Sequence, residues 1–190
     1  MENKVLVEIG GGDKPRKGFM SFDSREGFNV IFDELPLEDN SVDLIYASHI
    51  IEHIPVYVVR DVLKRLYKKL KVGGKIRILC PDMEKIIHAY VNKDYEAFER
   101  HNNHWGTVRK QERSLGIGGF FISQLISPGR DSDVSVDGRK ICSLGHICGY
   151  DFEMLQNVLL QSGFSQVRRT ELLSWDTWQE DGQLCVIAIK

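Results

Sequence analysis

Three consecutive glycines follow a short apolar segment near the start of the chain. Residues 5–13 read Val-Leu-Val-Glu-Ile-Gly-Gly-Gly-Asp, which places the acidic Glu8 two positions before the first glycine. Because Gly10 and Gly12 lack side chains, the backbone can approach a ligand closely at these positions. A strand that runs directly into a glycine turn is typical of sheets that bind nucleosides and nucleotides. We therefore expect this turn to bind a nucleoside-containing cofactor.

Acidic residues and a second motif follow the glycine turn. Asp23 ends the apolar run 19–22, and Asp-Glu-Leu-Pro at residues 33–36 precedes Val-Asp-Leu-Ile-Tyr at residues 42–46. The order of glycine turn, acid at a strand end, Asp-x-Leu-Pro and Val-Asp-Leu-Ile-Tyr resembles that of the class I S-adenosylmethionine-dependent methyltransferases. The resemblance covers roughly residues 1–90 and resumes over residues 146–164.

The resemblance implies S-adenosyl-L-methionine as the cofactor and suggests a role for each matching residue. The acid that matches Glu8 orients the glycine turn or reaches the ammonium of the methionine tail. The acid that matches Asp23 accepts hydrogen bonds from both ribose hydroxyls, in a charge-assisted geometry. The acid that matches Asp33 lies near the adenine amino group, and the residue at Leu35 packs on the adenine ring. The implied cofactor-binding set is Glu8, Gly10, Gly11, Gly12, Asp23, Ser24, Asp33, Glu34, Leu35, Ser48 and His49.

His49-Ile-Ile-Glu52-His53 matches a zinc-peptidase pattern, which we considered as an alternative. That chemistry requires both histidines on one face of a helix. Pro55 argues against such a helix because a proline disfavours helical geometry at the preceding residue. A second metal-like cluster, formed by Cys142, His146 and Cys148, lacks the spacing of a zinc finger. We therefore predict no metal site.

Methyl transfer is an in-line displacement at a carbon that the positive sulfur already activates. The protein has to align the acceptor with the methyl group, exclude water and accept any proton that the acceptor loses. We predict His49 and His146 as candidate bases, and Glu52 as an orienting group. His146 matches the His-x-x-x-Tyr-Asp stretch of the family; the alternative is that it caps the next helix or fixes the lid. His101, His104 and Trp105 are weaker pocket candidates.

Short apolar runs alternate with amphipathic runs along the chain, which predicts an α/β fold. We expect a Rossmann-like class I methyltransferase sheet, mostly parallel with a reversed last strand, because no helical pattern separates the last two strands. The first two connections are too short for ordinary crossover helices. This spacing is similar to that of a compact subgroup of the family. We expect strands near residues 4–9, 19–23, 30–33, 42–47, 75–80, 166–170 and 184–189, and helices from Pro55 to Gly73-Gly74, over 83–91 and over 152–162.

Composition indicates one globular domain over residues 1–190, with 92–149 as an inserted lid for substrate recognition. The apolar part of this insertion, 120–126, could close over substrate or form a homodimer contact. The net charge of -2 gives no electrostatic argument for nucleic-acid binding, and no apolar run is long enough to span a membrane. Four scattered cysteines suit reduced thiols in a cytoplasmic protein.

These features together predict an S-adenosylmethionine-dependent methyltransferase that modifies a small-molecule acceptor, at oxygen or nitrogen of a metabolite, sugar or natural-product precursor. One alternative is a nucleotide-binding oxidoreductase of the NAD type, which requires a third glycine where the chain has Pro15 and an acid later than Asp23. Another alternative is a non-catalytic protein that keeps the fold in order to bind or dimerise.

Overall fold

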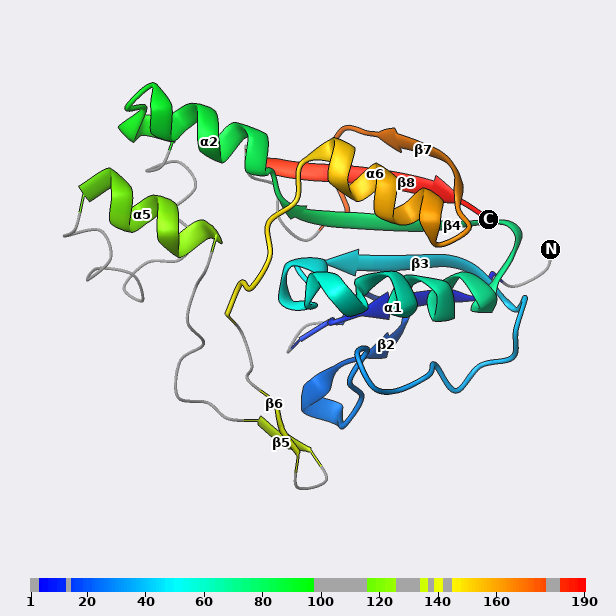
Figure 1. Ribbon diagram of the computed structural model, residues 1–190. Coiled ribbons are helices and arrows are strands. Elements are labelled where there is room, and N and C mark those ends of the chain that lie inside the picture. Colours follow the sequence, from blue (N-terminus) through cyan, green and yellow to red (C-terminus); the bar gives the residue numbers. More distant parts are fainter. Residues whose placement is uncertain are drawn as a thin grey trace.

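The computed structural model describes residues 4–12, 15–97, 116–125, 134–136, 139–141, 145–176 and 182–190 (Figure 1). Within these residues, six strands form one sheet in the order β2-β1-β3-β4-β8-β7, and two further strands pair separately. The strands of the main sheet are β1 (Leu6–Ile9), β2 (Met20–Phe22), β3 (Val42–Ser48), β4 (Leu70–Pro81), β7 (Ser165–Arg169) and β8 (Gln183–Ile189); the separate pair is β5 (Val134–Val136) and β6 (Arg139–Ile141).

The last strand of the chain is reversed relative to its neighbours. β1 pairs in parallel with β2 and β3, and β3 pairs in parallel with β4. β8 pairs antiparallel with both β4 and β7. The predicted Rossmann-like sheet is therefore confirmed. Because β1, β2 and β3 are parallel, their carboxyl ends meet at one edge, where open α/β sheets bind their ligands.

Two helices cover one face of the sheet, α1 (Val56–Lys69) and α6 (Phe152–Gln161) (Figure 1). Each presents an apolar stripe with the spacing of an amphipathic helix. The buried side chains are Val59, Val62, Leu63 and Leu66 of α1, and Leu155 and Leu159 of α6. They join the strands in one core cluster, which holds the edge of the sheet with the glycine turn in place.

The connections after β1 and β2 are short, as predicted. Among the described residues, the only helical segment between β1 and β3 is one turn of 3-10 helix, η1 (Ser24–Glu26). The strand predicted over 30–33 is wrong, because these residues lie in and just after a turn. Asn29 Oδ1 accepts from the Ile31 amide at 2.9 Å, and Asp33 Oδ2 accepts from the Asn29 amide at 2.7 Å. Such side-chain-to-backbone bonds compete with strand pairing and stabilise a turn.

The predicted end of the helix after Pro55 is also wrong. α1 ends at Lys69, and Leu70 is already extended and pairs with Val42 in the sheet. Pairing and burial of Leu70 therefore end the helix before Gly73 is reached. Gly73 adopts a φ of 79° in a turn within β4 instead, where its amide donates to the carbonyl of Lys190 at 3.0 Å.

The region predicted as a lid contains α5 (Gly116–Leu125), which covers most of the apolar run of that region. α5 packs beside α2 (Met83–Val91), and both helices project beyond the sheet in Figure 1. The rings of Tyr90 and Phe121 lie 4.6 Å apart between their centroids. The function of this region as a lid stays a prediction, and the candidates His101, His104, Trp105 and Cys142 lie outside the described residues.

No helix in the described part of the chain has both the length and the apolar character of a membrane span. Cys80, Cys148 and Cys185 are free thiols.

Candidate cofactor and catalytic site

The first two glycines of the turn after β1, Gly10 and Gly11, pack so tightly that a side chain would not fit there. Gly10 adopts a φ of 76°, and its amide donates to the carbonyl of Phe22 at 2.9 Å. A Cβ on Gly11 would lie 2.5 Å from Ser21 Oγ and 3.0 Å from Glu8 Oε2. The turn therefore brings bare backbone to the carboxyl end of β1, as expected for a nucleoside site.

Replacing Gly10 by alanine is expected to destabilise the protein through both backbone strain and packing. A Cβ there would lie 2.1 Å from Ile50 Cδ1, and the φ of Gly10 is one that L-residues rarely adopt. Gly18 has a φ of 85°, but a Cβ added to it would meet no heavy atom within 4 Å, so Gly18→Ala is the matched control for strain alone. Urea unfolding should show a loss of about 1–2 kcal/mol for Gly18→Ala and about 1–2 kcal/mol more for Gly10→Ala. Equal losses would contradict the close contact with Ile50.

The side chain of Glu8 packs against the glycine turn. Its side chain is buried, and Oε2 accepts from the Arg16 amide at 2.6 Å while Oε1 lies 3.6 Å from Arg16 Nε. The Arg16 guanidinium also lies over the ring of Tyr46 at 4.4 Å and that of Trp175 at 5.0 Å, and it donates to the carbonyl of Trp175. Of the two roles predicted for Glu8, this geometry fits orientation of the turn.

Asp23 ties the end of β2 to the glycine turn. Its Oδ2 accepts from the Gly12 amide at 3.0 Å, and its Oδ1 accepts from the Arg25 amide at 2.9 Å. The carboxylate thereby caps η1, in which Ser24 is the first residue. Each carboxylate oxygen has a second lone pair, so both can still accept a ligand hydroxyl. The predicted pairing of Asp23 with ribose is compatible with this arrangement.

The next three predicted cofactor-binding residues are Asp33, Glu34 and Leu35. They lie after a turn and do not follow a strand. Asp33 accepts from the Asn29 amide, and Leu35 is buried in the core cluster. Glu34 is exposed, and its Oε2 lies 3.9 Å from Lys69 Nζ. Lys69 ends α1 where β4 begins, at the edge of the sheet opposite the glycine turn. The carboxylate of Glu34 is therefore directed away from the turn.

The chain bends sharply after β3. His49 adopts a φ of 56°, which is uncommon for a residue other than glycine, and its amide donates to the Leu79 carbonyl at 2.8 Å. Such left-handed residues cost free energy and often occur at functional sites. The bend leads into the 3-10 helix η2 (Ile51–His53) and brings His49 Nδ1 to 3.0 Å from Glu52 Oε1. Beside it, Ser48 Oγ is buried and makes no hydrogen bond with the described residues.

A distant segment completes the histidine cluster. The amides of Ile147 and Cys148 donate to the carbonyl of Glu52 at 3.0 and 3.1 Å. This anchoring brings His146 Nε2 to 3.9 Å from Glu52 Oε1, and its ring packs edge-on against that of His53 with centroids 5.1 Å apart. The side chains of His49 and His146 therefore both lie near the Glu52 carboxylate, so the three predicted catalytic residues form one cluster.

Glu52 is buried, with only 1% of it exposed. Burial by itself raises the pKa of this carboxyl group. The hydrogen bond from His49 and the charges of His49, His53 and His146 outweigh burial, so the pKa of Glu52 lies below its ordinary value. His53 also belongs to this cluster, although the predicted catalytic set of His49, Glu52 and His146 leaves it out.

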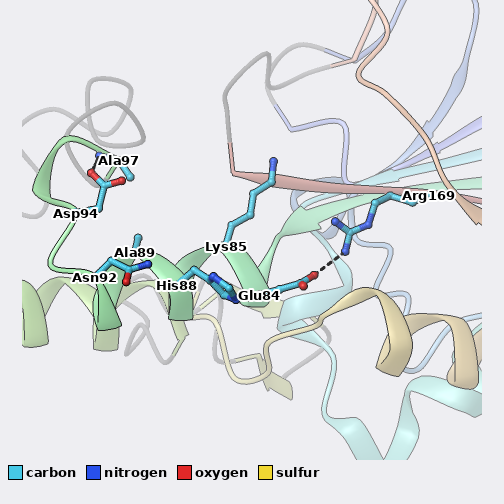
Figure 2. Close-up of a pocket in the computed structure, with 8 residues that line it drawn as sticks. All are labelled: Glu84, Lys85, His88, Ala89, Asn92, Asp94, Ala97 and Arg169. Atoms are coloured by element: carbon cyan, nitrogen blue, oxygen red, sulfur yellow. Dashed lines mark hydrogen bonds and ion pairs between the residues drawn. The ribbon is translucent and has the colours of Figure 1, made fainter.

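A separate surface hollow of about 430 Å³ lies along α2 (Figure 2). Arg169 closes one end, 3.1 Å from Glu84 and 3.3 Å from Asp82. The hollow contains none of the predicted cofactor or catalytic residues. Its lining residues are Glu84, Lys85, His88, Ala89, Asn92, Asp94, Ala97 and Arg169.

Comparison with known proteins agrees with this fold. Residues 26–78 match the family described as a methyltransferase domain. No curated protein sequence matches the chain. Among solved structures, an S-adenosylmethionine-dependent methyltransferase from Mesorhizobium loti superimposes with a TM-score of 0.50 at 12% identity, covering 99% of this chain and 91% of that one.

Two further structures are larger than this chain. The S-adenosylmethionine-dependent methyltransferase SibL gives a TM-score of 0.53 at 11% identity, covering 100% of this chain and 51% of SibL. The CMeT domain of the citrinin polyketide synthase gives a TM-score of 0.52 at 13% identity, covering 99% of this chain and 46% of that one. This chain thus spans about half the length of these two.

The parallel sheet with its reversed last strand and the glycine turn at its ligand-binding edge define a class I methyltransferase fold. The match of residues 26–78 to the methyltransferase-domain family agrees with this fold.

Proposed function

We propose that this protein transfers the methyl group of S-adenosyl-L-methionine to an oxygen or nitrogen atom of a small-molecule acceptor, such as a metabolite, sugar or natural-product precursor. The observation that carries the proposal is the position of the cluster formed by Glu52 and its neighbouring histidines, which lies beside the glycine turn. Ile50, between His49 and Glu52, contacts Gly10 so closely that a Cβ on Gly10 would overlap it. A cofactor on the turn therefore has groups that can accept a proton next to it.

In this proposal the ligand-binding edge of the sheet holds the cofactor. The backbone of Gly10, Gly11 and Gly12 approaches the adenosyl group, and Asp23 with Ser24 binds the ribose. Asp33 and Leu35 lie toward the adenine, while Ser48 and His49 contact the methionine portion. Because the carboxylate of Glu34 is engaged with Lys69, a contribution of Glu34 would come from its backbone.

The His49–Glu52 pair suits deprotonation of the acceptor. A hydroxyl acceptor loses its proton as its oxygen attacks the methyl carbon, and a histidine within hydrogen-bond reach can take that proton. The Glu52 carboxylate, 3.0 Å from His49 Nδ1, orients the imidazole and stabilises its charged form. His146 contacts the same carboxylate from the other segment. An unprotonated amine would require no base.

A small acceptor fits the charge of the chain better than a nucleic acid does. Lys and Arg together number 25 against 27 for Asp and Glu, so the chain has no overall positive field for a phosphate backbone. The expected homodimer, the lid function and the cytoplasmic location stay predictions.

Asp23→Asn is the first test of this proposal. The variant keeps one side-chain oxygen for the backbone but loses the charge, so we expect the affinity for S-adenosyl-L-methionine, measured by calorimetry, to fall about 10–100-fold. Asp43→Asn is the matched control. Asp43 also accepts from a backbone amide, that of Val5 at 2.8 Å, but it lies at the start of β3. Unchanged affinity in Asp23→Asn would contradict the assignment of the ribose site.

The acceptor class is tested with methyl-labelled cofactor and a panel of phenols, sugars, amines, RNA and protein. We expect label in small molecules with hydroxyl or amino groups. Incorporation only into RNA or protein would overturn the small-molecule proposal, and the absence of any incorporation despite cofactor binding would favour a non-catalytic role.

A further inference from the structure

We propose that Glu52, His53 and His146 bind one divalent transition-metal ion of the zinc class. One ligand atom from each of these three residues lies within 4.8 Å of the other two. Imidazole and carboxylate ligands are those that zinc-class ions prefer, and three protein ligands with an open fourth position are typical of catalytic zinc sites. The prediction from sequence that no metal binds considered His49 and His53 as a pair, whereas the structure places His146 beside His53.

The first argument is the charge of the cluster. Glu52 is 1% exposed, and among the described residues no lysine or arginine pairs with it. Its Oε2 is buried and makes no hydrogen bond with the described residues. A buried carboxylate is costly unless a cation or several donors compensate it. Histidine rings that bind a metal are neutral, and a divalent ion held between Glu52 and the two histidines would then supply the compensation in place of their charges.

The second argument is the orientation of His53. Its Nδ1 lies 2.9 Å from the carbonyl oxygen of Gly145. A carbonyl only accepts hydrogen bonds, so Nδ1 carries a proton, and in the neutral ring the other nitrogen then keeps its lone pair. Histidines that bind metals usually donate their second ring N–H to a carbonyl or carboxylate in this way, which fixes the ring.

The third argument is that the backbone holds the site together before an ion arrives. The amides of Ile147 and Cys148 both donate to the carbonyl of Glu52, which fixes the segment that carries His146. Ligand atoms of a tetrahedral zinc site lie about 3.3–3.5 Å apart, so these side chains, whose ligand atoms lie within 4.8 Å of one another, would draw closer when the ion binds. His53 is half-buried, whereas Glu52 and His146 are buried.

The role of the ion rests on the proposed function. A metal-bound hydroxyl has a lowered pKa, so the acceptor would be an alcohol or a phenol. The proton of the acceptor hydroxyl passes to His49, which is not a metal ligand. The acceptor oxygen then forms a bond to the methyl carbon. The bond from that carbon to sulfur breaks, and sulfur leaves with the electron pair as the neutral thioether of S-adenosylhomocysteine. In this arrangement His146 is a ligand and His49 is the base.

The experiment measures metal and cofactor binding separately on the full chain. Chelator-treated protein is titrated with Zn²⁺ by calorimetry and with Co²⁺ by visible absorption, which reports tetrahedral coordination. We expect one ion per chain, and a loss of affinity in His53→Ala and His146→Ala at least as large as the roughly 10–100-fold caused by removing an outer-shell partner. His88→Ala, which removes an exposed histidine of α2, is the matched control.

Binding of S-adenosyl-L-methionine should be unchanged in both histidine variants, so failure of the metal site and failure of the proposed function can be told apart. The proposal is overturned if the protein binds no Zn²⁺, if His53→Ala and His146→Ala bind it as tightly as His88→Ala, or if Mg²⁺, which prefers oxygen ligands, competes equally.

Discussion

Asp176→Ala is expected to lower the free energy of unfolding by about 3–5 kcal/mol, because it leaves the buried guanidinium of Arg77 without its counter-ion. The side chains of Arg77 and Asp176 are 2% and 0% exposed. Arg77 Nε donates to Asp176 Oδ1 at 2.8 Å, and a second guanidinium nitrogen donates to Oδ2. Burial disfavours the charged guanidinium, but Asp176 outweighs this and raises the pKa of Arg77. Chemical unfolding should therefore show a marked fall in the midpoint.

Two controls separate the buried charge from packing. In Arg77→Met/Asp176→Leu both charges are gone, so we expect a smaller loss of stability than in Asp176→Ala. Lys71→Ala removes a partly exposed pair with Asp43, which is expected to cost at most about 1 kcal/mol. If Asp176→Ala were no more destabilising than Lys71→Ala, the pair would not stabilise the fold as the structure implies.

The same pair also supports the proposed cofactor site indirectly. Asp176 Oδ2 accepts from the Leu173 amide at 2.7 Å, so the segment before Asp176 is fixed against β4. Trp175 in this segment packs on Tyr46, with ring centroids 5.3 Å apart, and lies under the guanidinium of Arg16. Because Arg16 in turn holds Glu8, Asp176→Ala should also weaken binding of the cofactor.

Most of the sheet could be predicted from the sequence, because its central strands are continuous apolar runs between recognisable helices. The run at residues 30–33 looks equally apolar, yet it forms a turn. The difference is made by hydrogen bonds of Asn29 and Asp33 to the backbone, which composition does not reveal. The end of α1 is likewise decided by the pairing of Leu70 with Val42, a contact between segments distant in sequence.

The catalytic candidates were predicted residue by residue, but their arrangement was not. His49 and Glu52 are close in sequence, so a turn after β3 suffices to bring them together. The contact of His53 with Gly145 spans 92 positions, and that of Arg77 with Asp176 spans 99. Neither contact produces a recognisable pattern in the nearby sequence, because each joins segments that only the folded sheet brings together.

Glu52→Gln is expected to lower kcat for a hydroxyl acceptor by about 10²–10⁴-fold, the usual contribution of general acid–base catalysis. Glutamine keeps the size of the side chain and the backbone carbonyl that binds Ile147 and Cys148. It removes the negative charge that lies 3.0 Å from His49 Nδ1 and 3.9 Å from His146 Nε2. The measurement is transfer of labelled methyl to the acceptor that the panel identifies.

The effects of Glu52→Gln on kcat and on KM show whether this charge acts in the chemical step. A loss confined to kcat, with unchanged KM for the cofactor, places the effect in the transition state. A rise in KM for the cofactor would mean that Glu52 instead shapes the cofactor site through Ile50 and Gly10. Glu153→Gln, in the exposed first turn of α6, should leave both constants unchanged. Full activity of Glu52→Gln would show that the charge of this buried carboxylate plays no part in methyl transfer, because glutamine leaves the rest of the cluster in place.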